Sequence, residues 1–91
     1  MKTDFQPSPA DLSKSMKILG IDSFNWKERL KDLPSALINE EEKQKAFNWC
    51  KENFDYSWTW SHRLGTSQCV FYFENDLQLI QFTLKFNTLL A

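Results

Sequence analysis

Two aromatic runs near the middle of the chain restrict its fold more than any other feature. In residues 54–62 the aromatic side chains alternate with Asp55, Ser57 and Thr59, and residues 67–74 repeat the alternation. A period of two is typical of a strand with one buried face. If an even loop joins the two runs, the three apolar pairs named below share one face, whereas an odd loop would set the aromatics against the wrong side of the partner strand. The expected loop is either 64–65 or 63–66, and the expected pairs are Trp60 with Cys69, Trp58 with Phe71 and Tyr56 with Phe73.

Size and charge narrow the fold and function classes. The chain has 91 residues, which predicts one domain, and its four Trp, eight Phe and two Tyr predict a small core made mostly of rings. Eleven basic and twelve acidic residues give a net charge of −1, so the basic excess of a duplex DNA binder is missing. No signal-like or membrane-length apolar run is present, so we expect a cytoplasmic protein without a membrane partner.

Three helices are predicted before the hairpin. Ser8 and Pro9 are typical helix-start residues, and Gly20 is a typical stop, which predicts a helix over 9–19. Apolar spacing predicts a second helix over 24–32, ended by Pro34. The third is predicted over 40–53, where Asn39 and three glutamates match the chemistry of a helix start.

The segment after the hairpin has two interpretations. Residues 80–87 alternate between apolar and polar, which favours a strand at about 81–87 after a turn or short helix at 76–80. Leu77, Ile80 and Leu84 also fit a helix. With the strand preferred, the fold class is α+β: three N-terminal helices packed on a small antiparallel three-stranded sheet. The single domain 1–91 then divides into a flexible segment 1–7, a helical part 8–53 and a sheet part 54–91.

A pattern in the last third of the chain resembles small accessory proteins of tailed phages. It consists of Trp58-x-Trp60, Arg63-x-Gly65, the aromatic run 71–73, Asp76 in the following gap, and the closing run 82–86. The chain departs from that family where Asp-Ala is expected, because Asp76 is followed by Leu77. The resemblance implies a three-stranded sheet and a phage-like setting, with host cytoplasm as the location. It implies no catalytic residue.

The residues that could support catalysis do not combine into a site. His62 is the only histidine, and Ser61 beside it would face the opposite side of a strand. Asp55 and Glu74 would face each other in the expected register. Because two carboxylates repel each other, this position more simply predicts that the strand pair frays at that end. Cys50 and Cys69 are expected to be reduced, packed thiols. We therefore expect no enzyme, no cofactor and no metal.

Two binding functions remain open. Small size, low net charge and many aromatics favour a protein that binds and modulates or inhibits a host protein. The alternative is a single-stranded RNA or DNA binder that stacks bases near Arg63 or on the sheet face carrying Val70 and Tyr72. The predicted contact site is the hairpin tip, where Leu64 either stays open for a partner or folds back onto Trp60. Its residues are His62, Arg63, Leu64 and Thr66.

Overall fold

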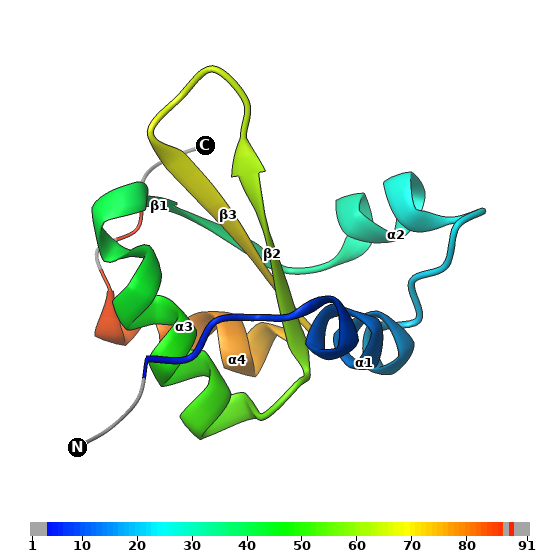
Figure 1. Cartoon of the computed structure of the whole chain (residues 1–91), viewed down its shortest axis with the longest axis horizontal. Coiled ribbons are helices and arrows are strands. Elements are labelled where there is room, and N and C mark those ends of the chain that lie inside the picture. The colour runs from blue at the N-terminus through cyan, green and yellow to red at the C-terminus, as the bar shows by residue number, and fades with distance from the viewer. Residues whose placement is uncertain (1–3, 87, 89–91) are drawn as a thin grey trace.

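The computed structural model describes residues 4–86 and 88. Its elements are helices α1 (Pro9–Leu19) and α2 (Trp26–Asp32), strand β1 (Ser35–Asn39), the 3₁₀ turn η1 (Glu40–Glu42), helix α3 (Lys43–Phe54), strands β2 (Trp58–Arg63) and β3 (Gln68–Phe73), and helix α4 (Asp76–Lys85). The three strands form one antiparallel sheet in the order β1-β3-β2 (Figure 1). The α+β class and the three-stranded antiparallel sheet are therefore confirmed.

The prediction that all helices precede the sheet is wrong. Residues 76–85 form α4, where a strand was expected at about 81–87; Asn87 itself lies outside the described residues. Asn75 caps this helix, because its side-chain oxygen accepts a hydrogen bond from the amide of Gln78 at 3.0 Å. The third strand is β1, which lies within the part of the chain expected to be helical.

The hairpin register differs from the expected one by two residues. Trp58 is paired with Phe73 and Trp60 with Phe71, and the four residues 64–67 form the loop. The loop is even, so the expected common face is confirmed for Trp58, Trp60, Phe71 and Phe73, whereas Phe54 and Tyr56 precede β2 and lie outside the sheet. The specific pairs are wrong, because a two-residue shift preserves the faces and changes only the partners. Trp58 and Phe71 still stack diagonally, with ring centroids 5.6 Å apart.

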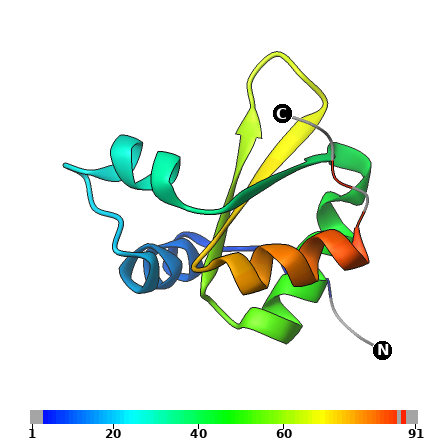
Figure 2. The same cartoon turned by 180° about the vertical axis from the view of Figure 1, so that it is seen from behind.

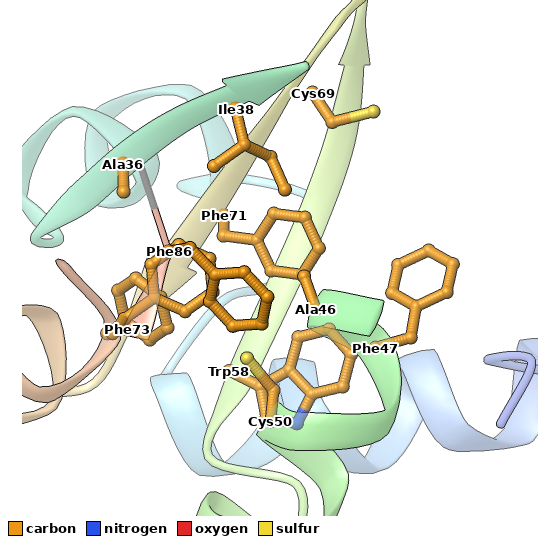
Figure 3. Close-up of a cluster of buried hydrophobic side chains, with 11 residues drawn as sticks. Ala36, Ile38, Ala46, Phe47, Cys50, Trp58, Cys69, Phe71, Phe73 and Phe86 are labelled. Atoms are coloured by element: carbon orange, nitrogen blue, oxygen red, sulfur yellow. The ribbon is translucent and has the colours of Figure 1, made fainter. Parts of the chain in front are cut away.

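The aromatic side of the sheet, which we call the first face, carries the main core. Helices α3 and α4 cover it (Figure 2), and Phe47 and Phe82 from these helices are fully buried in the cluster that Figure 3 shows in part. Phe82 lies 5.5 Å from Phe71 and 5.0 Å from Phe73 between ring centroids. The buried members of this core are Ala36, Ile38, Ala46, Phe47, Cys50, Trp58, Cys69, Phe71, Phe73, Phe82 and Phe86.

Helices α1 and α2 contact the opposite side of the sheet, the second face, and form a smaller cluster there. Leu19, Ile21 and Leu33 are buried together, with Leu30 and Tyr72 packed against them. Gly20 ends α1 in the left-handed conformation, with a φ of 72°, and Arg29 donates to the carbonyl of Leu19 at 2.8 Å. The second face therefore has its own apolar contacts at the end nearest α2.

The predicted start of α1 is confirmed. Ser8 and Asp11 form a capping box, and the hydrogen bonds from the amide and hydroxyl of Ser8 lower the pKa of the Asp11 carboxyl. Upstream, the amide of Phe5 donates to the Asn48 side chain at 2.7 Å, so the segment just before α1 contacts α3. Of the segment 1–7 that was expected to be flexible, residues 1–3 lie outside the described residues.

Candidate functional site: the hairpin tip and the second face

The hairpin tip is closed by its own hydrogen bonds. The hydroxyl of Thr66 donates to the Arg63 carbonyl at 2.7 Å and accepts from the amide of Gln68 at 3.2 Å. Gly65 has a φ of 74°, a conformation that side-chain-bearing residues rarely adopt. Thr66 thus stabilises the turn, and the loop between β2 and β3 projects from the end of the sheet (Figure 1).

Leu64 is the first residue of the loop at this tip. Its exposed fraction is 91%, so the expected alternative in which Leu64 folds back onto Trp60 is wrong. Trp60 instead contacts Phe47 at a centroid distance of 4.9 Å, with the Lys43 ammonium 5.3 Å from its ring. A large apolar side chain is therefore presented to solvent by a turn that fixes its position.

The structure separates the two charged candidates of the tip. His62 is paired with Cys69 and lies on the first-face side, with its Nε2 atom 3.8 Å from a carboxylate oxygen of Glu40. Arg63 follows it in β2, so its side chain lies on the second face. Its guanidinium makes one long hydrogen bond to Gln68, at 3.4 Å. All four predicted site residues are exposed, although the Thr66 hydroxyl is engaged in the turn and the His62 ring lies beside Glu40.

A wide hollow lies beside Arg63 on the second face. One part, between α2 and the sheet, has a volume of about 560 Å³, and another part, along the strands, has about 590 Å³. The two parts share Ser35, Val70 and Tyr72, so they form one continuous surface. We call this surface the second-face hollow; its other described lining residues are Trp26, Lys27, Leu30, Lys31, Ala36, Leu37, Ser61, Arg63, Leu79, Thr83 and Thr88.

The charges around this hollow have one sign. Lys27, Lys31 and Arg63 line it, and none of its described lining residues is an aspartate or a glutamate. Helical spacing explains the segregation, because Lys27 and Lys31 are four residues apart on the side of α2 that also carries Trp26 and Leu30. In a protein with a net charge of −1, this local excess of cations favours an acidic ligand.

Sequence reasoning named Arg63, Val70 and Tyr72 but missed the contribution of α2. The signal was present as two overlapping pairs in residues 26–31, one of Trp26 with Leu30 and one of Lys27 with Lys31. It predicts a helix face that is half apolar and half basic. Only the tertiary arrangement shows that this helix face meets β3.

The groups considered for catalysis lie apart. Asp55 does not face Glu74 as expected; it ends α3, where Lys51 contacts it at 3.0 Å. Burial raises the pKa of the Cys50 thiol and of the Cys69 thiol, which lie at separate ends of the core in Figure 3. Within the described part of the chain, no three His, Cys, Asp or Glu side chains are grouped closely enough to hold a metal ion.

No protein-family model, curated protein sequence or solved structure matches this chain significantly. None of the helices formed by the described residues is both long enough and apolar enough to cross a bilayer. The residues and their geometry therefore carry the functional argument alone.

Proposed function

We propose that this chain is a small non-enzymatic binding protein that docks on an acidic segment of another protein through its hairpin tip and second-face hollow. The observation that supports this most strongly is the segregation of charge. Lys27, Lys31 and Arg63 line one continuous surface without a carboxylate among its described residues, although acidic residues outnumber basic ones in the sequence. Cations placed beside apolar side chains are typical of an interface for acidic peptides.

Apolar side chains on the same surface are the second feature expected of a protein interface. Leu64 projects from the tip, and Trp26 and Tyr72 lie in the hollow next to the cations. Trp, Tyr and Arg are the side chains that most often anchor protein interfaces. In the proposed complex, acidic side chains of the partner pair with Lys31 and Arg63, while apolar side chains contact Tyr72 and Leu64.

A single-stranded nucleic acid is the second candidate ligand. Its supporting observation is that two aromatic side chains, Trp26 and Tyr72, adjoin the same cations, so that bases could stack while phosphates pair with Lys27 and Lys31. Against this candidate, the described residues that line the hollow include only three cations. The affinity of a protein for single-stranded nucleic acid depends mainly on the number of phosphates that its cations neutralise. A site with few cations therefore favours the protein partner.

A binding measurement with two defined probes tests the proposal. Fluorescence anisotropy of the full chain is recorded with a labelled glutamate-rich peptide that contains leucines and with a labelled oligothymidylate. We expect the peptide to bind, and we expect Lys31→Glu with Arg63→Glu to weaken it by roughly a hundredfold, since two close charge pairs become repulsive. The matched control is Lys45→Glu, which reverses an exposed cation on α3, away from the hollow.

Three outcomes separate the alternatives. Loss of peptide affinity in the double variant, with retention in the control, supports the proposed surface. Tight oligothymidylate binding without peptide binding would assign the surface to nucleic acid. Binding of neither probe, or equal loss in the control, would contradict the proposal. Modulation of a host protein in a phage-like setting remains a further proposal, and it predicts that the same double variant loses its target from bacterial lysate treated with nuclease.

A further inference from the structure

Helix α4 is apolar on two sides. Phe82 and Phe86 face the core, and the opposite stripe of Leu77, Ile80 and Leu84 remains in solvent with exposed fractions of 64%, 54% and 83%. Their spacing places these three side chains on one side of the helix. Contiguous exposed apolar side chains of this kind mark an interaction surface more often than an ordinary surface.

The order of residues along this stripe is self-complementary. In a two-fold symmetric pair, a residue near the axis faces its own copy, so a charge there is repelled by itself. The centre of α4 carries Ile80 and Gln81, which are uncharged. The charges lie at its ends, with Asp76 in the first turn and Lys85 in the last turn.

We propose that α4 joins two copies of this chain as an antiparallel helix pair. In that arrangement Leu77 of one copy meets Leu84 of the other, and Ile80 lies near the two-fold axis. Each end of the pair then contains the acidic start of one helix and the basic end of the other. A parallel pair would instead place Asp76 against Asp76 and Lys85 against Lys85, so charge favours the antiparallel arrangement.

The position of α4 makes this dimer compatible with ligand binding. Helix α4 covers the first face of the sheet, and although Leu79 and Thr83 on one side of it reach the second-face hollow, the outer stripe of Leu77, Ile80 and Leu84 does not line that hollow. A dimer through the outer stripe of α4 would therefore carry two hollows. Since α4 has ten residues and is about 15 Å long, the interface is small and its association should be reversible.

The first test is sedimentation velocity of the full chain over roughly a hundredfold range of concentration. We expect a concentration-dependent shift from monomer to dimer, and we expect Leu84→Gln to weaken dimerisation at least about tenfold. The matched control is Leu64→Gln, because Leu64 is as exposed as Leu84 but lies at the hairpin tip. A wild-type chain that stays monomeric throughout, or a Leu84→Gln variant that dimerises normally, would overturn the proposal.

Charge reversal tests the orientation. Asp76→Lys and Lys85→Glu should each weaken the antiparallel dimer, because each places like charges at both ends. The variant with both changes should regain affinity, and melting curves confirm that each variant is folded. Failure of the double variant to recover contradicts the antiparallel pair. Because neither dimerisation test uses a ligand, their results are independent of the proposed function. If the chain stays monomeric and Leu84→Gln also loses binding of the glutamate-rich peptide, the dimer is overturned and the stripe contacts the partner protein instead.

Discussion

The two faces of strand β3 differ in almost every respect, although their residues alternate along one short segment. Cys69, Phe71 and Phe73 have an exposed fraction of 0%, and helices cover them completely. Val70 and Tyr72, the residues between them, are half-buried and line a hollow with cations at its margins. One face of β3 is thus buried, while the other is partly exposed to solvent.

This difference shows how a small domain separates stability from recognition. Because successive side chains of a strand point to opposite faces, the first face can be filled with rings while the second remains free to vary. Most of the aromatic residues contribute to the core through the first face, where ring centroids lie 4.8–6.2 Å apart. Changes on the first face should therefore affect folding, and changes on the second face should affect binding.

The largest expected effect is on the first face. Phe71→Ala should lower the free energy of unfolding by about 3–5 kcal/mol, because it removes a fully buried ring between Trp58 and Phe82. Val70→Ala, its neighbour on the second face, should cost about 1 kcal/mol or less. Urea unfolding of both variants measures the contrast, and equal losses would show that the two faces contribute equally to stability.

The second effect concerns the hairpin tip. Arg63→Ala with Leu64→Ser should reduce affinity for the acidic peptide at least about tenfold, because it removes one cation and the apolar side chain at the tip. The melting temperature should stay unchanged, since Leu64 is almost fully exposed. Anisotropy and thermal unfolding are measured on the same samples. Full affinity in this variant would remove the tip from the binding surface.

A third effect is pH-dependent and belongs to the first face. Burial raises the pKa of Cys50 and of Cys69, so the folded chain disfavours both thiolates. The resulting stability is complete below the unfolded thiol pKa of about 8.5 and is lost as pH rises, by up to about 1.4 kcal/mol per thiol and pH unit. Urea unfolding between pH 8 and pH 10 should show this decline, with a shallower slope for Cys50→Ala. A slope unaffected by that substitution would mean that the thiols titrate freely.

The smallest effect lies outside both faces, at the junction of α3 and β2. Asp55 has a φ of 57° and a ψ of −104°, a conformation that glycine tolerates better than other residues. Asp55→Gly should raise stability by about 0.5–1 kcal/mol, because relieved strain outweighs the exposed contact with Lys51. Thermal unfolding measures the change, and Asp55→Ala, which removes the contact without relieving strain, is the control.

The parts of the fold that sequence predicted are those set by local chemistry. Ser8 and Gly20 bound α1 as expected, and the alternation of aromatics identified the first face. The register was not determined, because a shift of the pairing by two residues, which gives the observed loop 64–67, leaves every side chain on the same face. Strand β1 was missed because its apolar residues, Ala36, Leu37 and Ile38, are consecutive and all buried, so they show no alternation.

Helix α4 was taken for a strand because two helical stripes overlap in its sequence. Ile80 and Leu84 belong to the exposed stripe, whereas Phe82 and Phe86 belong to the buried one, and together they alternate with polar residues. The candidate site shows a similar limit. The tip could be predicted from Leu64 and Arg63, but the lysines of α2 become part of the site only through tertiary contact with β3.

The most direct test of the separation between the faces is a titration of the isotope-labelled chain with the glutamate-rich peptide, followed by amide chemical shifts in NMR spectra. We expect the shifts to concentrate around the second-face hollow and the tip, at Lys31, Arg63, Leu64, Val70 and Tyr72. The amides of the core-facing segments of α3 should remain unchanged. Shifts concentrated on α3 or α4, with none along the hollow, would contradict the account.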